Sequence, residues 1–169
     1  MLQRFYPEQC AKSTYAIDYE ELYRKGFRGL LFDIDNTLVK HGEDATKESI
    51  ALFEQLKKMG FQICLISNNK VERVERFNKD VNVHYIYNAR KPSRKNYLKA
   101  MELMGTDLSN TMFIGDQLFT DVYGASRVGI HNILVEPIDK KEEIQIVLKR
   151  YLEKIVLFFY RRKLKKRKN

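Results

Sequence analysis

The chain has 169 residues, of which 44% are hydrophobic and 12% aromatic. This length corresponds to one ordinary domain, and this composition supports a buried core and excludes an intrinsically disordered chain. The formal net charge is +9, but residues 161–169 hold seven cations and no acid, and subtracting these seven leaves +2 for the rest of the chain. The nearly balanced body argues against a nucleic-acid-binding fold and indicates a basic tail with its own electrostatic role.

From residue 19 onward, segments with helical spacing of apolar residues alternate with short apolar runs typical of buried strands. Glycines close several of the helical segments, as Gly60 and Gly105 do, and Ser93 is expected to be an N-cap. The expected elements are a helix over 19–25, a strand over 29–33, a helix over 50–59, a strand over 61–67, a helix over 71–77, a strand over 84–87, a helix from 94 to 104, a strand over 111–116, a helix over 120–128 and a strand over 131–135.

This alternation predicts an α/β fold in which five mainly parallel strands form one sheet covered by helices on both faces. Crossovers between parallel strands are right-handed, and ligands of such sheets bind beyond the carboxyl ends of the strands. The residues that directly follow each strand are therefore the candidates for a functional site.

The number of cysteines and the N-terminal sequence indicate the cellular compartment in which the protein is expected. Cys10 and Cys64 are too few for a disulfide framework or a cysteine-rich zinc site, so a reducing compartment fits. Cys64 lies in an apolar run and is expected to be a buried thiol. No secretory signal is visible at the N-terminus, and no segment approaches the ~20 apolar residues of a transmembrane helix. We therefore expect a cytoplasmic protein.

Polar residues with phosphate and metal chemistry follow the predicted strands. Carboxylates can bind a hard cation or attack phosphorus, whereas a hydroxyl and an ammonium can hold phosphate oxygens. Taken singly, each residue has an ordinary explanation as a turn residue, a cap or a solvated lysine, and Arg90 competes with its neighbour Lys91. Their joint occurrence at one edge favours a site. The candidates are Asp33 and Asp35, Ser67 and Asn68, Lys91, and Asp116 with Asp121.

Four of these segments together resemble the motifs of the haloacid dehalogenase-like (HAD) phosphatases: residues 33–39, Ser67-Asn-Asn, Lys91-Pro92 and residues 115–121. The resemblance covers residues 29–136 and implies a Rossmann-like three-layer α/β/α sandwich. The runs Ala-Arg-Lys-Pro at 89–92 and Leu-Val-Glu-Pro at 134–137 further resemble the small YqeG-like group of uncapped subfamily III.

This YqeG-like group is similar to phosphatidylglycerophosphate phosphatases. The narrower match extends to the N-terminal arm over residues 5–17. The group commonly has two glycines where this chain has Gly124-Ala125.

Chemistry and resemblance together assign roles to these residues. Asp33 attacks phosphorus and forms an aspartyl-phosphate, Asp35 serves as the general acid and base, and Ser67 and Lys91 hold the phosphoryl oxygens. A carboxylate facing a phosphate dianion needs a cation, and Mg²⁺ suits oxygen ligands. The resemblance implies that Mg²⁺ binds side-chain oxygens of Asp33 and Asp116 and the backbone carbonyl of Asp35. The supporting residues are Asp121, which orients Asp116, a metal-bound water or Lys91, together with Asn68 and Thr37.

No cap domain is expected, because residues 36–66 contain only a loop and one helix and residues 68–90 are fewer still. An uncapped site is open. Either a partner covers it, for which a homo-oligomer is one option, or the substrate is large or embedded in something large.

The C-terminal segment divides the chain into a phosphatase domain over 1–140 and an amphipathic helix with a basic tail over 141–169. Apolar residues recur on one helical face of 141–160. One interpretation is a last helix packed on the sheet with a solvated tail. The other is a helix lying on an anionic membrane, with its cations toward the headgroups. RNA ranks third, because no aromatic residues are interleaved within 161–169.

Three functional hypotheses remain at this point. The first is a phosphatase that acts on a phosphatidylglycerophosphate-like lipid as a peripheral protein on the inner membrane face. The second is a soluble phosphatase for a sugar phosphate or nucleotide, with its site closed by oligomer partners. The third is a non-enzymatic peripheral membrane or ribonucleoprotein-associated protein with an idle site, against which the complete set of acids argues.

Overall fold

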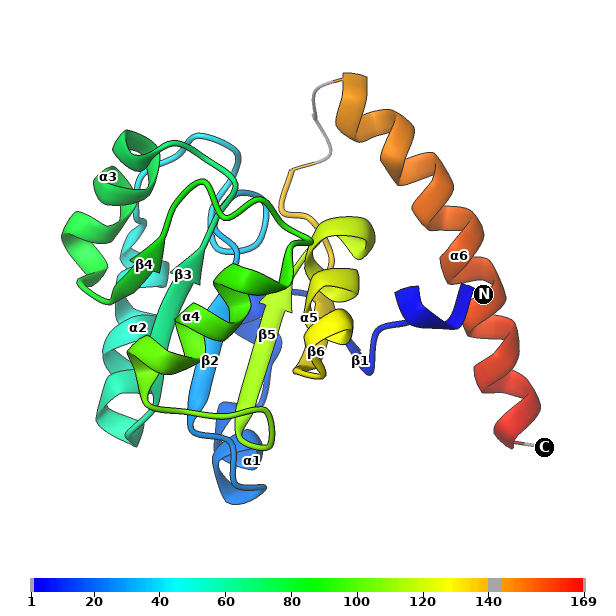
Figure 1. The fold of residues 1–169 in the computed structure, drawn as a ribbon, viewed down its shortest axis with the longest axis horizontal. Coiled ribbons are helices and arrows are strands. Elements are labelled where there is room, and N and C mark those ends of the chain that lie inside the picture. The colour runs from blue at the N-terminus through cyan, green and yellow to red at the C-terminus, as the bar shows by residue number, and fades with distance from the viewer. Residues whose placement is uncertain (1, 140–143, 169) are drawn as a thin grey trace.

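A computed structural model describes residues 2–139 and 144–168. Its centre is a single sheet whose strand pairs are all parallel, in the order β1-β6-β5-β2-β3-β4. Figure 1 shows this sheet with helices in front of it and behind it. The strands are β1 (Gln9–Ala11), β2 (Gly29–Phe32), β3 (Gln62–Ile66), β4 (His84–Ile86), β5 (Thr111–Gly115) and β6 (His131–Val135).

The helices connect these strands as the sequence predicts. They are α1 (Tyr19–Arg24), α2 (Lys47–Met59), α3 (Val71–Val81), α4 (Arg94–Met104), α5 (Tyr123–Val128) and α6 (Ile144–Lys168), with short helical turns at η1 (Leu2–Phe5), η2 (Thr14–Ala16) and η3 (Leu118–Val122). The segment η3 has π-helical hydrogen bonding and runs directly into α5. The Rossmann-like α/β prediction is therefore confirmed.

The prediction of five strands is wrong by one. The additional strand, β1, pairs with β6 at the edge of the sheet, with Cys10 opposite Leu134. It has only three residues, and none of them is fully buried. Such a short edge strand has neither the apolar run nor the alternation that reveals a strand in a sequence.

Helix boundaries follow local capping chemistry. Helix α2 begins earlier than its apolar spacing indicates, because Thr46 and Ser49 form a reciprocal capping box ahead of the first apolar residue. Gly60, with φ of 96°, ends the helix in the left-handed conformation. Ser93 does occupy the N-cap position of α4, but its side chain makes no capping hydrogen bond.

Two hydrophobic clusters cover the two faces of the sheet. Successive side chains of a strand point to opposite faces, so Phe32 packs among residues of α1, α2 and α3 while its neighbour Leu31 packs with α4 and α5. Every residue of β2 is buried. The central strand is thus fixed on both sides, and the residue that follows it has little freedom to move.

The register places the ends of three strands at one level. Phe32 of β2 lies opposite Leu65 of β3 and Ile114 of β5. The residues that follow these three strands therefore meet at the same edge. The connections on this edge contain loops, short helical turns and the helices that cover the sheet, so the described chain carries no cap domain here, as predicted.

Helix α6 lies beside the sheet rather than on one of its faces, next to the N-terminal turn η1 (Figure 1). Its inner side contacts η1 and η3. Within the described residues, no helix is both long enough and apolar enough to cross a membrane.

A close contact under α5 gives the first prediction. A Cβ atom at Gly124 would lie 2.1 Å from the hydroxyl oxygen of Tyr97, whose ring is fully buried. Gly124→Ala must therefore displace Tyr97, and we expect it to lower the free energy of unfolding by about 1–3 kcal/mol. Urea denaturation measures this change. Lys99→Ala, at an exposed position of helix α4, which carries Tyr97, is the control and should change stability little. Equal stability of both variants would contradict the prediction.

Candidate active site

Asp33 is the first residue after the central strand. Its backbone N–H donates to the carbonyl oxygen of Ile114, 3.0 Å away, so the strand pairing with β5 extends to this residue. Ile34 is fully buried and points into the core, as expected for the residue between two functional acids. The Asp33 side chain is buried at the sheet edge, and its role as the nucleophile stays a prediction.

Lys91 joins two buried acids. Its ammonium lies 2.9 Å from Asp33 Oδ1 and 2.7 Å from Asp121 Oδ1. The backbone N–H of Lys91 donates to Asn68 Oδ1 at 2.7 Å, which fixes the loop after β4 to the loop after β3. Arg90, the rival from the sequence, is exposed, whereas Lys91 is buried. The lysine at the site is therefore Lys91.

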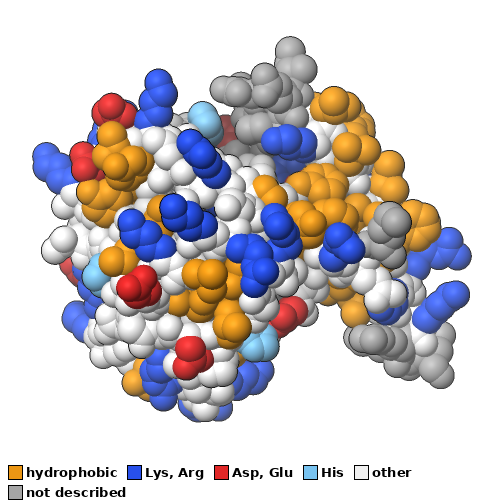
Figure 2. All heavy atoms as spheres, viewed as in Figure 1, with side chains coloured by type: hydrophobic (Ala, Val, Ile, Leu, Met, Phe, Trp, Pro, Cys, Tyr) orange, Lys and Arg blue, Asp and Glu red, His pale blue; other side chains and the backbone are white. Residues whose placement is uncertain are grey.

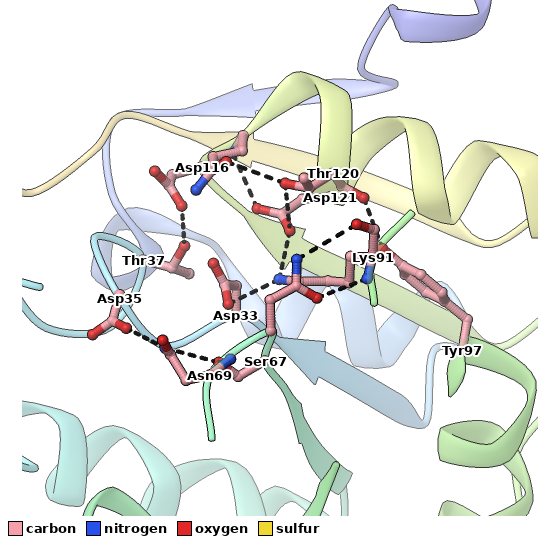
Figure 3. Close-up of polar contacts among 12 residues, drawn as sticks. Asp33, Asp35, Thr37, Ser67, Asn69, Lys91, Tyr97, Asp116, Thr120 and Asp121 are labelled. Carbon is pink, nitrogen blue, oxygen red and sulfur yellow. Dashed lines mark hydrogen bonds and ion pairs between the residues drawn. The ribbon is translucent and has the colours of Figure 1, made fainter. Parts of the chain in front are cut away.

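Asp116 enters the same cluster from the end of β5. Its Oδ1 atom accepts a hydrogen bond from the hydroxyl of Thr37, 3.0 Å away. The preceding residue must be small, because a Cβ at Gly115 would lie 2.5 Å from a carboxylate oxygen of Asp121. Asp121 is held in turn by the backbone N–H of Gln117, 3.0 Å from its Oδ2 atom. Figure 3 shows Asp33, Lys91, Asp116 and Asp121 gathered around one space.

Three of these carboxylates suit a metal ion. Asp33, Asp116 and Asp121 are all buried and offer oxygen atoms that lie within 4.8 Å of one another. Hard divalent cations such as Mg²⁺ are bound by carboxylate oxygens, so the residues fit the ion that the sequence implies. Asp121 thus belongs to the acidic cluster itself. That Asp35 contributes its backbone carbonyl stays a prediction.

The pKa values reflect this crowding. Burial raises the pKa of Asp33 to about 6, against the opposing effect of Lys91. Burial, reinforced by the charges of Asp121 and Asp33, raises the pKa of Asp116 to about 8. Burial alone would lower the pKa of Lys91, but the carboxylates of Asp121 and Asp33 more than offset it and raise that pKa. The acids therefore need additional positive charge to be ionised together.

Asp35 lies apart from the acidic cluster, on the other side of Asp33 (Figure 3). Its carboxylate accepts hydrogen bonds from the backbone of Gly42 at 2.9 Å and from Arg73 at 2.8 Å, and also from Asn69. Although burial opposes it, the hydrogen bonds from Gly42 and Arg73 and the charge of Arg73 lower the pKa of Asp35. The side chain is thus fixed in place at the mouth of the site, where the sequence predicts an acid–base group.

Ser67 stands at the end of β3 and is buried. Its Oγ atom accepts hydrogen bonds from the backbone N–H and the side-chain amide of Asn69, both at 3.1 Å. Because Ser67 is the acceptor in these contacts, its own O–H remains a donor for a ligand oxygen. Asn68 supports the site through the Lys91 backbone, and Thr37 through Asp116.

The sequence assigns no role to four residues at the site. Asn69 and Arg73 hold Asp35: Asn69 belongs to the Ser67-Asn-Asn motif without a role of its own there, and a single arginine of a surface helix carries no distinctive pattern. Arg150 and Glu153 come from α6: the Arg150 guanidinium contacts the Asp116 carboxylate, and Glu153 accepts the backbone N–H of Leu118 at 2.8 Å. The sequence placed α6 outside the catalytic unit, so only the tertiary arrangement reveals this contact.

The family assignment rests on sequence comparison. Residues 43–129 match the family model of the haloacid dehalogenase-like hydrolases. A Bacillus subtilis protein named "Probable phosphatase YqeG" is 35% identical, over 96% of each chain. The chain belongs to the haloacid dehalogenase-like hydrolases. The enzyme class predicted from the motifs, a phosphatase of this family, is thereby confirmed.

More distant relatives agree with this assignment. The chloroplastic and mitochondrial phosphatidylglycerophosphate phosphatase 1 of Arabidopsis thaliana is 26% identical over 95% of this chain and 48% of its own length. Among solved structures, a cobalt-bound deoxy-D-mannose-octulosonate 8-phosphate phosphatase from Haemophilus influenzae has a TM-score of 0.52 at 12% identity, covering 67% of this chain and 80% of its own. At this identity the structural likeness supports the HAD fold alone.

The raised pKa values predict how stability depends on pH. In the unfolded chain Asp116 releases its proton near its ordinary pKa of 3.8, whereas in the folded protein it does so near 8. Between these values the folded state binds more protons, so the free energy of unfolding of the metal-free protein should fall as the pH rises. The stability of Asp116→Asn relative to wild type should therefore increase from about pH 5 to about pH 8.

Urea denaturation in chelator at several pH values measures both proteins. Ser126→Ala, remote from the acids, serves as the control and should follow the wild-type pH dependence. If the free energies of unfolding of wild type and Asp116→Asn change in parallel with pH, the pKa of Asp116 is not raised in the folded protein.

Proposed function

We propose that this HAD hydrolase is a Mg²⁺-dependent phosphatase that transfers the phosphoryl group of a lipid phosphomonoester to Asp33. The observation that carries the catalytic part is the pairing of Asp33 with Lys91 beside Asp116 and Asp121, at the carboxyl edge of the central strands. Asp33, Asp116 and Asp121 are the side chains that would hold the ion. When bound, Mg²⁺ neutralises the carboxylates and the phosphate charge.

The chain's own residues perform the transfer. An oxygen of Asp33 attacks phosphorus and forms an aspartyl-phosphate, and the leaving oxygen takes a proton from Asp35. Because the hydrogen bonds from Gly42 and Arg73 lower the pKa of Asp35, this carboxyl must bind its proton and leave Arg73 when the substrate enters. Asp35 then accepts a proton from the water that hydrolyses the intermediate, which frees Asp33. The Lys91 ammonium and the Ser67 hydroxyl hold the phosphoryl oxygens as negative charge shifts among them. Asp121 positions Lys91, since it holds the ammonium at 2.7 Å.

Residues on α6 support a membrane surface as the location of the substrate. The apolar stripe predicted from the sequence points outward: Leu148, Tyr151, Leu152, Ile155 and Phe158 are each more than half exposed. Figure 2 shows hydrophobic side chains gathered along α6, with Lys and Arg side chains beside them. An exposed apolar stripe next to a cluster of cations suits an interface of anionic lipid.

The lipid part of the proposal has two further supports. The Arabidopsis relative acts, by its name, on phosphatidylglycerophosphate. The site has no cap domain to enclose a small substrate, so a substrate held by a surface can reach Asp33. In this proposal residues 1–140 form the catalytic domain, and residues 141–169 attach it peripherally to the inner membrane face.

The catalytic proposal predicts the behaviour of Asp33→Asn. The amide cannot attack phosphorus, so phosphate release should fall at least about a thousandfold. Folding should be retained, because the substitution removes a buried charge without changing side-chain size. Phosphate release is measured with Mg²⁺ from a panel that contains phosphatidylglycerophosphate in mixed micelles, a sugar phosphate and a nucleotide.

Excess chelator should abolish wild-type release. Turnover that persists in folded Asp33→Asn would refute the nucleophile, and turnover of the sugar phosphate or nucleotide alone would refute the lipid.

The membrane proposal predicts the effect of neutralising part of the tail. Replacing Arg162, Lys165 and Lys166 by Gln should weaken co-sedimentation with anionic vesicles at least about tenfold, because each cation contributes on the order of 1 kcal/mol at such a surface. The matched control replaces three exposed lysines of the catalytic domain: Lys47, Lys58 and Lys79.

High salt should reproduce the loss in the wild-type protein. Hydrolysis of a small phosphomonoester should be the same in both triple variants. Equal loss of vesicle binding in the two variants would exclude a specific role of the tail.

A further inference from the structure

A groove of about 720 Å³ lies between the inner side of α6 and the sheet edge formed by β1 and β6. Residues of β1, of the end of β6 and of one side of α6 line it. About half of these lining side chains are apolar or aromatic, among them Cys10, Leu134, Pro137, Leu157, Tyr160 and Leu164, and the others are charged or polar. A volume of this size is typical of a site for a small organic ligand.

One end of the groove reaches the catalytic cluster. Asp116 and Arg150 belong to its lining, and the Arg150 guanidinium donates to the backbone carbonyl oxygen of Asp116 at 2.6 Å. From Arg150 the lining continues along α6 to Leu164, roughly 20 Å at 1.5 Å per residue. This length exceeds the roughly 15 Å of one leaflet of a bilayer's hydrocarbon core. The groove can therefore accommodate an extended acyl chain that begins near the phosphate site.

The charged residues of the groove suit the phosphodiester group of a phospholipid, which would bind in addition to the phosphate at Asp33. Lys12, Lys154 and Arg161 lie along its sides. Of the acids in the lining, Glu8 pairs with His131 at 2.6 Å and Glu153 pairs with Arg150 at 3.0 Å, while Glu136 stands at the end of β6. Cations beside an apolar channel match a phosphodiester that carries acyl chains.

We propose that this groove is the binding site for the glycerophosphodiester and acyl part of a lipid whose terminal phosphomonoester lies at Asp33. The proposal rests on the lipid phosphatase function and adds the place where the rest of the substrate binds. Helix α6 then has two lipid-facing sides: its outer stripe lies on the membrane, and its inner side holds the molecule that leaves the bilayer. It supplies the substrate contacts that a cap domain would otherwise provide.

Cys10 offers a direct readout of the groove. It is an exposed thiol in the lining, whereas Cys64 is buried and serves as an internal unreactive control. The full-length Asp33→Asn variant with Mg²⁺ is treated with N-ethylmaleimide, so that the added ester is not consumed. Dioctanoyl phosphatidylglycerophosphate should slow Cys10 alkylation about tenfold at ten times its Kd. Glycerol 3-phosphate, which has the phosphomonoester without acyl chains, should protect little.

A matched pair of variants tests the far end of the groove. Leu164→Trp fills the lining at the end away from Asp116, whereas Leu148→Trp places the same side chain on the outer side of α6. In otherwise wild-type protein, Leu164→Trp should raise KM for the dioctanoyl ester at least about tenfold, the lower end of the 10–200-fold that one methylene in an apolar pocket contributes. Its effect on glycerol 3-phosphate, which is too short to reach this end of the groove, should be several-fold smaller. Leu148→Trp should change neither value.

The outcomes separate this inference from the function on which it rests. Absence of Cys10 protection, or equal protection by the two esters, overturns the groove even if the wild-type protein hydrolyses the lipid. Hydrolysis of small esters alone refutes the lipid substrate. Protection by the dioctanoyl ester without its hydrolysis supports the groove as a lipid-binding site while refuting the lipid phosphatase function.

Discussion

The concentration of buried negative charge at the end of the central strands is the constraint on which the rest of the structure depends. Oxygen atoms of Asp33, Asp116 and Asp121 lie within a few ångströms of one another, and within residues 2–139 and 144–168 the cations that contact them are Lys91 and Arg150. When all five groups are ionised, one negative charge remains in excess. Isolated buried charge is costly, so the cluster persists only because the surrounding sheet and loops hold the partners in place.

Neighbouring elements each contribute to holding this cluster. The pairing of β2 with β5 sets Asp33, the absence of a side chain at Gly115 makes room for Asp121, and Asn68 fixes the backbone of Lys91. The N-terminal arm adds a further layer, since the hydroxyl of Thr14 donates to the backbone carbonyl of Thr37 at 2.7 Å. Precise placement of charged groups, rather than a closed pocket, is what this scaffold provides for phosphoryl transfer.

Helix α6 links the interior of the site to its surroundings. Arg150 contacts Asp116 on the inner side of the helix, while Leu148 and Tyr151, which flank it in the sequence, are exposed on its outer side. Val156 and Leu157 of the same helix pack with Leu118 of η3 and Leu134 of β6. One helix thus combines a contact with the carboxylates of the acidic cluster and an apolar outer surface, which is why membrane attachment and substrate binding are proposed for the same element.

The sequence by itself determined the parallel α/β fold and the order of the site residues, because buried strands and their polar ends are encoded locally. It placed Asp33, Lys91 and Asp116 at one edge, since parallel strands align their carboxyl ends. Only the tertiary structure decided the sixth strand, the contact of Arg150 with Asp116 and the outward direction of the α6 stripe. Those features depend on how distant segments pack, and a helix with an apolar face has the same periodicity whether that face is buried or exposed.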